Sequence, residues 1–315
     1  MRTLALANGD VMPALGLGTW RAEPSAVAKV VRQALELGYR HIDAAAIYGN
    51  EAEIGEALEQ AFADGVVRRE ELWITSKLWC DCHAPEDVRP ALERTLADLR
   101  LTYLDLYLIH WPVVLRPGVQ FPQSAEDLVP LEQVPLAPTW AAMEDLQSAG
   151  LCRHIGVSNV SQAKLQALVE QARVVPAVNQ VERHPYLQQP DLLAYCREKG
   201  IILTAYSPLG AGRTDNPSPV LADPVITSLA AERGATPAQV LLAWGLACGT
   251  VVIPKALGRE HLAANLAAQD LELDAEAMAQ LTALERRERF VDGSFWFMPG
   301  SPYTEANLWD GPPAQ

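Results

Sequence analysis

The stretch HIDAAAIYGNE, residues 41–51, contains the unit from which the fold can be predicted. HID is a short apolar strand. The segments on either side, SAVAKVVRQALELG (25–38) and EAEIGEALEQAF (51–62), have the apolar spacing of amphipathic helices, and Gly38 is a typical helix end. The chain therefore passes from helix to strand to helix, which is typical of α/β proteins.

The same alternation continues along the 315 residues. We expect eight strands, at 15–18, 41–43, 72–78, 104–110, 154–159, 176–182, 201–207 and 251–255. Their continuous apolar runs favour a parallel sheet that is covered on both faces. Eight strand–helix units predict an α/β fold of the closed (β/α)8 TIM-barrel type, formed by a single domain over residues 1–315.

Two further features refine this prediction. Asn8-Gly9 lies between two short apolar segments and predicts an N-terminal β-hairpin. The alternative is an open doubly wound sheet, but the segments that begin at Gly16 and Gly210 lack the third glycine of a dinucleotide-binding fingerprint. We therefore prefer the closed barrel.

Composition limits the possible partners and location. The formal charge is −14, which disfavours binding to nucleic acid or anionic membranes. The sequence has no apolar run long enough to span a bilayer and no signal-peptide core at its start. Five cysteines without a framework spacing are typical of reduced thiols. We expect a cytoplasmic monomer that acts on a small molecule.

Three irregular segments follow or flank the predicted strands. Residues 112–138 are rich in proline, residues 207–222 are rich in Gly, Pro and Ser, and the tail from about residue 285 is rich in aromatic residues. The first two follow strand C-termini, the face of a barrel that carries the active site. We expect them to form a lid and a pocket wall; the alternative is surface decoration.

A carboxylate that ends an apolar strand needs a partner, because its unpaired burial costs several kcal/mol. Asp43 is such a carboxylate. Most lysines lie on helices, and of the two at strand ends, Lys77 is on the neighbouring strand, so it is the expected partner. An ammonium near Tyr48 would lower the pKa of the phenol and make it a better acid at neutral pH. His110 ends the next strand and could orient the oxygen that is protonated.

Each of these residues also has a structural interpretation. His110 could be a rim histidine with satisfied hydrogen bonds, Tyr48 a packing residue, and Asp43–Lys77 a structural ion pair. Their joint position at one end of the barrel favours a site that polarises and protonates a carbonyl. For Gly49-Asn50-Glu51 we expect only a turn that starts the next helix.

Along nearly its whole length the chain resembles the aldo-keto reductase family, of the aldose and aldehyde reductase type. The matching stretches occur in the family's order: GYRHIDAAAIYGNE (38–51), ITSKLW (74–79), LYLIHWP (106–112), IGVSN (155–159), AVNQVERHPY (177–186), AYSPLG (205–210) and VVIPKA (251–256). The resemblance implies metal-free reduction of aldehydes or ketones with NAD(P)H. It implies that Tyr48 is the proton donor, that Lys77 lowers the pKa of Tyr48, that Asp43 pairs with Lys77, and that His110 orients the carbonyl.

The resemblance also implies where the cofactor binds. Tyr206 would stack on the nicotinamide, and Ser158, Asn159 and Gln180 would hydrogen-bond its carboxamide. The loop Ser207-Pro208-Leu209-Gly210 would cover the pyrophosphate. Asp43 and two residues after the first strand, Thr19 and Trp20, would lie near the nicotinamide.

Lys255 would bind the 2′-phosphate of NADPH, together with residues of the following segment: Ala256, Leu257, His261 and Asn265. Here the sequence departs from the pattern of members that prefer NADPH, because Ala256, His261 and Ala264 replace a serine, an arginine and an acidic residue. Histidine cannot grip phosphate as arginine does. Arg259 is a possible second cation. We expect NADPH, with NADH as the alternative.

Aromatic residues are expected to line the substrate pocket beside Tyr48 and His110: Trp20, Trp79, Trp111, Phe295, Trp296 and Phe297. They suit apolar or ring-bearing aldehydes. The tail aromatics could instead only pack over the barrel rim.

Cys80-Asp81-Cys82-His83 raises the question of a metal, but no second cluster completes a tetrahedral set, and solvent-exposed loop residues are the preferred interpretation. Two alternatives to a reductase stay open. One is a non-catalytic, cofactor-binding regulatory protein on the same fold, and the other is a metal-dependent barrel hydrolase or isomerase.

Overall fold

The computed structural model describes residues 1–210 and 218–311, and its centre is an eight-stranded sheet. All pairings within this sheet are parallel. The strands follow one another in chain order: β3 (Leu17–Gly18), β4 (His41–Asp43), β5 (Trp73–Leu78), β6 (Leu104–Ile109), β9 (Cys152–Ser158), β10 (Val178–Glu182), β11 (Ile202–Tyr206) and β12 (Val251–Val252).

The first and last strands meet and close the sheet into a barrel. Leu15 forms a parallel bridge with Val252. The Gly16 N–H donates to the Val252 carbonyl at 2.9 Å, and the Gly18 N–H donates to the Pro254 carbonyl at 3.1 Å. The (β/α)8 prediction is therefore confirmed, and the open doubly wound alternative is wrong.

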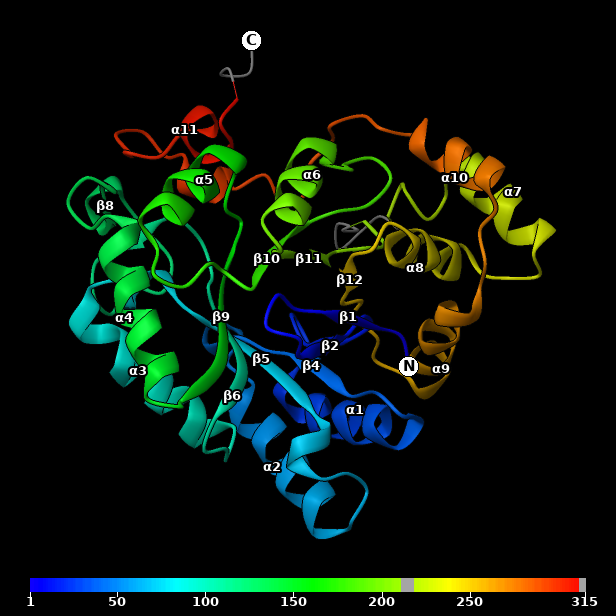
Figure 1. Ribbon diagram of the computed structural model, residues 1–315, viewed down its shortest axis with the longest axis horizontal. Coiled ribbons are helices and arrows are strands. Elements are labelled where there is room, and N and C mark those ends of the chain that lie inside the picture. The colour runs from blue at the N-terminus through cyan, green and yellow to red at the C-terminus, as the bar shows by residue number, and fades with distance from the viewer. Residues whose placement is uncertain (211–217, 312–315) are drawn as a thin grey trace.

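Helices surround this barrel, as Figure 1 shows. The helices are α1 (Pro24–Leu37), α2 (Glu51–Ala63), α3 (Pro85–Asp98), α4 (Leu136–Ser148), α5 (Gln162–Gln171), α6 (Pro190–Glu198), α7 (Pro224–Glu232), α8 (Pro237–Ala247), α9 (Arg259–Ala267), α10 (Ala275–Thr282) and α11 (Glu305–Trp309). The apolar faces of α1 to α6 pack against the outward side chains of the strands in one large core, whereas α7, α10 and most of α8 form a second apolar cluster. Gly38 ends the first helix at φ 102°, as its sequence predicts.

The N-terminal hairpin closes the barrel at the end where the strands begin. It consists of β1 (Thr3–Ala5) and β2 (Val11–Pro13), and Gly9 in its turn has φ 91°. Met12 is buried in the barrel interior with Leu106 and Val251. Because the hairpin fills this end, any site for a small molecule along the barrel axis must lie at the other end.

The irregular segments have more structure than their sequences indicate. Residues 112–138 contain a small hairpin, β7 (Val114–Leu115) with β8 (Leu128–Val129). Helices α10 and α11 were not predicted. Part of the predicted loop 207–222, residues 211–217, lies outside the described residues. Short 3-10 helices are η1 (Ala46–Tyr48), η2 (Arg69–Glu71), η3 (Cys80–Cys82), η4 (Ala125–Asp127), η5 (Ala268–Asp270) and η6 (Ser294–Trp296).

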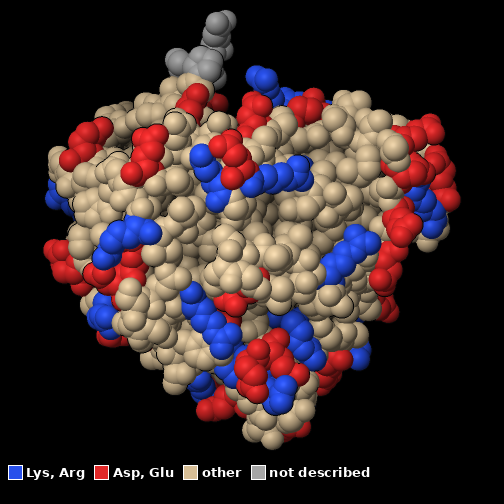
Figure 2. Space-filling model, in the orientation of Figure 1, with Lys and Arg blue, Asp and Glu red and all other residues tan. Residues whose placement is uncertain are grey.

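Charge on the hairpin side of the molecule is mixed. In Figure 2 basic and acidic side chains are interspersed on the face that carries the hairpin, so this face has no large patch of one sign. No helix among the described residues is both long enough and apolar enough to cross a membrane.

Candidate active site

Four polar side chains come together at the C-terminal ends of neighbouring strands. Asp43 ends β4, Lys77 lies near the end of β5, and His110 directly follows β6. Tyr48 ends the 3-10 helix η1, which follows β4. Lys77 is fully buried, and Asp43 and His110 are nearly so, whereas Tyr48 is half-buried. The sequence-predicted group is therefore present on one rim of the barrel.

Lys77 is the centre of this group. Its Nζ donates to Asp43 Oδ1 at 2.5 Å, to the Ala44 carbonyl at 2.9 Å and to the Tyr48 hydroxyl at 3.3 Å. The second carboxylate oxygen of Asp43 accepts from Gln180 Nε2 at 2.7 Å. Asp43 is thus held from two sides, and the ammonium is directed at the phenol. The bond to Gln180 was not predicted, because the two residues are far apart in sequence.

The charges in this group act against a strong desolvation. Burial lowers the pKa of Lys77, but the nearby Asp43 and Tyr48 oxygens raise it above the usual value. Burial raises the pKa of Tyr48 above its usual value, and Lys77 works against this rise. The expected effect of Lys77 on Tyr48 is present, but it does not outweigh burial. The phenol is therefore protonated at neutral pH.

His110 lies against Tyr48 as a neutral ring. Burial, together with the charges of Lys77 and His83, holds the pKa of His110 well below its usual value. Its ring centre is 5.8 Å from that of Tyr48, with the planes at 74°. Asn159 Nδ2 donates to the His110 carbonyl at 2.9 Å and so fixes the backbone of this residue. A neutral imidazole carries one N–H that can donate to a carbonyl oxygen.

The polar residues predicted to hold a nicotinamide lie beside this group. The Tyr206 hydroxyl donates to Asn159 Oδ1 at 2.7 Å, and Ser158 Oγ donates to the Gln180 carbonyl at 2.8 Å. Thr19 Oγ1 donates to the Asp43 carbonyl at 2.8 Å. These side chains are therefore preordered at the ends of β3, β9, β10 and β11.

The predicted phosphate-binding residues lie where the last strand meets the first. Lys255 is exposed, and its Nζ donates to the Arg21 carbonyl at 2.8 Å. Burial and the charge of Arg21 lower the pKa of Lys255. Arg259 is less free than predicted, because it forms a 3.3 Å ion pair with Glu36. Ala256 is buried and Leu257 exposed in the loop before α9; on α9, His261 is exposed and Asn265 is buried.

The loop after β11 begins as a tight turn. Ser207 has φ 46° and Gly210 has φ 71°. A Cβ at Gly210 would lie 2.5 Å from Ser218 Oγ and 2.6 Å from Val220, so only glycine fits at this position. Pro208 is buried and Leu209 half-buried.

Aromatic side chains form a cluster above His110. The Trp79 ring lies 5.0 Å from His110, 5.6 Å from Phe121 and 6.0 Å from Trp296, as measured between centres. Trp111 contacts Phe295, Trp296 and Trp309. Trp20 lies 4.9 Å from Tyr48 on the other side.

The members of this cluster differ in exposure. Trp20 and Phe295 are 46% and 44% exposed, and Phe297 is partly buried, whereas Trp296 is fully buried. The tail aromatics therefore divide between the predicted pocket lining and core packing. Phe121 and Trp309 were not predicted as members of the cluster, and their positions in irregular segments offer no periodic signal.

Comparison with known proteins agrees with this geometry. Residues 14–286 match the sequence model of the Aldo/keto reductase family. This chain belongs to the aldo/keto reductase family. An aldo/keto reductase of Synechocystis sp. is 56% identical over 318 residues, covering 98% of this chain and 97% of that protein. Aldo-keto reductase family 1 member A1 of Sus scrofa is 46% identical over 292 residues, covering 91% and 90%.

A solved structure gives the same result. The aldose reductase from Schistosoma japonicum superposes with a TM-score of 0.86 at 41% identity, covering 93% of this chain and 95% of that one. Members of the aldo/keto reductase family reduce small carbonyl compounds with nicotinamide cofactors, and membership therefore assigns NAD(P)H-dependent carbonyl reduction to this protein.

One sequence expectation about this reductase is wrong. Cys80 and His83 are buried, and Asp81 and Cys82 are half-buried, so the segment 80–83 is not a solvent-exposed loop. The reason is that η3 packs directly under the aromatic cluster, beside Trp79. Within residues 1–210 and 218–311, no three His, Cys, Asp or Glu side chains gather as a possible ligand set for a metal.

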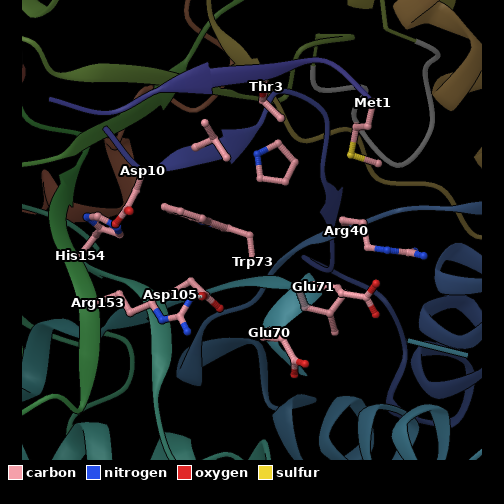
Figure 3. A pocket seen from close by; sticks show the side chains of 13 residues that line it. Met1, Thr3, Asp10, Arg40, Glu70, Glu71, Trp73, Asp105, Arg153 and His154 are labelled. Atoms are coloured by element: carbon pink, nitrogen blue, oxygen red, sulfur yellow. Dashed lines mark ion pairs between the residues drawn. The ribbon is translucent and has the colours of Figure 1, made fainter. Parts of the chain in front are cut away.

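A hollow of about 380 Å³ lies at the opposite end of the reductase, between the hairpin and the beginning of β5 (Figure 3). Trp73 forms its floor and stacks on His154, with ring centres 5.3 Å apart. Asp10 pairs with His154 at 3.0 Å, and Arg153 approaches Asp105 at 3.4 Å. Its charges face one another, and the tetrad, which consists of Asp43, Tyr48, Lys77 and His110, lies at the other end, so this hollow is separate from the candidate active site.

Proposed function

We propose that this aldo/keto reductase reduces aldehydes or ketones to alcohols with NADPH, and that Tyr48 donates the proton. The observation that carries the proposal is the contact of a buried ammonium with both a carboxylate and a phenol. Lys77 Nζ lies 2.5 Å from Asp43 and 3.3 Å from Tyr48. Nothing in simple packing requires an ammonium directed at a phenol.

Each residue has one task in this proposal. The neutral His110 ring donates its N–H to the substrate oxygen and places it beside the Tyr48 hydroxyl. Tyr48 transfers its proton to that oxygen and becomes a phenolate, which the Lys77 ammonium stabilises. Asp43 holds Lys77 in place. NADPH, when bound, supplies the hydride that adds to the carbonyl carbon.

The groups around the tetrad suit a nicotinamide. Tyr206 presents a half-buried ring for stacking, and its hydroxyl is fixed by Asn159. Gln180 uses its Nε2 on Asp43, and no described residue donates to its Oε1, which is therefore available to accept from a carboxamide. Ser158 lies beside it, and the turn Ser207–Gly210 covers the pyrophosphate.

The preference for NADPH rests on Lys255. It is an exposed cation next to the start of α9, whose N–H groups also favour a phosphate. His261 and Asn265, four residues apart on α9, lie on one side of the helix, with Ala256 and Leu257 before it. Arg259 contributes less, since Glu36 already pairs with it.

The proposed substrates are apolar or ring-bearing carbonyl compounds. Trp20 lies against Tyr48 and Trp79 against His110, and Trp296, Trp111 and Phe295 continue the aromatic surface from Trp79. Such a lining disfavours highly charged substrates.

The decisive experiment is the Tyr48→Phe change. It removes the acid and keeps the ring, so kcat for aldehyde reduction should fall by about 10³-fold, within the usual range for general acid catalysis. Binding of NADPH, followed by fluorescence, should change little.

Tyr39→Phe is the matched control, because Tyr39 is a buried phenol that bonds the Leu262 carbonyl, away from the tetrad. It should keep the wild-type kcat. Undiminished turnover by Tyr48→Phe would remove Tyr48 as the acid.

Lys255→Met tests the cofactor preference. It should weaken NADPH binding by about tenfold, the effect of losing one exposed charge–phosphate contact worth ~1.4 kcal/mol, and should leave NADH binding unchanged. Lys199→Met, at the exposed end of α6, is the control. Equal affinity of the wild-type enzyme for the two cofactors would refute the preference.

A further inference from the structure

Glu51 is three residues after Tyr48 and bonds to Ser76, the neighbour of Lys77, but it has none of the roles described above. It is the first residue of α2. The sequence predicts only a turn that starts a helix here, yet the Glu51 side chain is buried, with 4% of the residue exposed. A buried carboxylate needs a physical reason, because its desolvation is costly.

The carboxylate of Glu51 connects three elements. Its Oε1 accepts from Ser76 Oγ on β5 at 2.5 Å, and its Oε2 accepts from Thr95 Oγ1 on α3 at 3.0 Å. Both partners are buried. No Lys, Arg or His of the described residues lies within ion-pair distance of it, so hydroxyl groups alone satisfy this carboxylate.

Ser76 makes this connection specific to the active site. Successive side chains of a strand point to opposite faces, so Ser76 faces the helices while Lys77 faces the barrel interior. Glu51 therefore holds the outer face of the strand segment whose inner face presents the ammonium. Through the chain it also holds the short loop that presents Tyr48.

We propose that Glu51 is a positioning residue of this reductase, which fixes the Tyr48 loop against the Lys77 strand and places a buried carboxylate on the outer face of that strand. The proposal rests on the function proposed above. A hydrophobic side chain at residue 51 would leave the buried Ser76 and Thr95 hydroxyls without their acceptor, so the link between the Tyr48 loop, β5 and α3 depends on the Glu51 carboxylate.

The charge of Glu51 reaches the tetrad. Burial raises the pKa of Glu51 to about 7, the Ser76 and Thr95 hydroxyls lower it, Asp98 of α3 raises it and Lys77 lowers it. Burial is the main reason that the pKa of Tyr48 is raised, and the charges of Asp43 and, to the smallest extent, Glu51 add to this rise. Burial also raises the pKa of Tyr107 on β6, and Glu51 adds to it. Removing this negative charge must therefore lower the pKa of the Tyr48 phenol.

Two substitutions separate position from charge. Glu51→Leu removes the hydrogen bonds and the charge; kcat per cofactor-binding site should fall about tenfold, as expected for a small displacement of reacting groups, while the Kd for NADPH stays within about twofold. Glu51→Gln can still accept from Ser76 and donate to Thr95. It should restore kcat to within about threefold of the wild type and move the basic limb of the pH–rate profile to lower pH.

The control is Asp105→Asn, which alters a buried carboxylate at the far end of the barrel and should leave kcat and the basic limb unchanged. Ser76→Ala provides a second route if Glu51→Leu does not fold. It cuts only the link to β5 and should lower kcat severalfold.

A wild-type kcat in Glu51→Leu or Ser76→Ala would overturn the proposal, and so would an unshifted basic limb in Glu51→Gln. The wild-type assay separates the two hypotheses. An inactive wild-type protein refutes the proposed function and this inference with it, whereas an active wild type with indifferent variants refutes the inference alone.

Discussion

The two ends of this barrel both contain buried charges, but they use them differently. At the hairpin end, Asp105 pairs with Arg69 at 2.7 Å and accepts the Ile74 N–H at 2.9 Å. At the other end, Lys77 pairs with Asp43 but keeps a third contact for the Tyr48 hydroxyl. In the first arrangement the carboxylate is bonded to protein groups of the closed end, whereas in the second the ammonium also contacts Tyr48, a half-buried side chain at the open rim.

The difference shows how a functional ion pair can be recognised. Breaking a structural pair should lower the free energy of unfolding and leave kcat unchanged. Breaking a functional pair should lower kcat by more than its loss of stability explains. Substitutions of Asp43 at one end and Asp105 at the other test this distinction. The weaker Asp10–His154 pair at the hairpin end provides a third case.

Asp43→Asn should have the largest effect. It loosens Lys77 and removes a negative charge that raises the pKa of both Lys77 and Tyr48. We expect kcat to fall about 100-fold, the size of a misplacement of catalytic groups, and the basic limb of the pH–rate profile to move to lower pH. Steady-state kinetics from pH 6 to about 10 measure both. A wild-type pH–rate profile would mean that Asp43–Lys77 resembles the structural pair.

Asp105→Asn should cost stability instead. Arg69 would lose its buried partner, and the free energy of unfolding should fall by about 2 kcal/mol. Urea unfolding measures this loss, and kcat per folded molecule should equal that of the wild type. A large loss of kcat would remove the contrast between the two ends.

Asp10→Asn should have the smallest effect, and only in acid. Burial lowers the pKa of His154, and Asp10 opposes this change. The folded protein therefore takes up a proton on His154 less readily than the unfolded chain, and it loses stability as the pH falls below about 6.5.

Without Asp10 this loss should be steeper, by less than about 1 kcal/mol because Asp10 is 59% exposed. Thermal unfolding at pH 7 and pH 5.5 measures it. An identical decrease in Tm for variant and wild type would show that the Asp10–His154 contact is unimportant.

Much of the fold is predictable from sequence because its units are local. Strand–helix alternation places all eight barrel strands, and single residues such as Gly38 mark helix ends as expected. The small hairpin β7–β8 and helix α10 could not be predicted in the same way. They lie in segments whose form depends on packing against the rim rather than on their own periodicity.

The candidate site shows the same division. Asp43, Lys77 and His110 could be grouped because the ends of parallel strands meet at one rim. The Gln180–Asp43 bond crosses the barrel, and the burial of Glu51 depends on hydroxyls from two other elements. No local pattern encodes such contacts. For Glu51, the one available signal is an acidic residue three positions after Tyr48, the proposed proton donor.

The closure of the barrel between Leu15 and Val252 also has a consequence for synthesis of the chain. During synthesis Asp43, Tyr48, Lys77 and His110 leave the ribosome first. Gln180 emerges later, and Lys255 emerges after the last strand, β12. The strands that carry Asp43, Lys77 and His110 can therefore pair early, whereas Gln180, which holds Asp43, and the residues proposed to bind the cofactor come together with them only when the ring closes. A stalled or truncated chain would expose the unpaired edges of β3 and β11, which invite association with other chains.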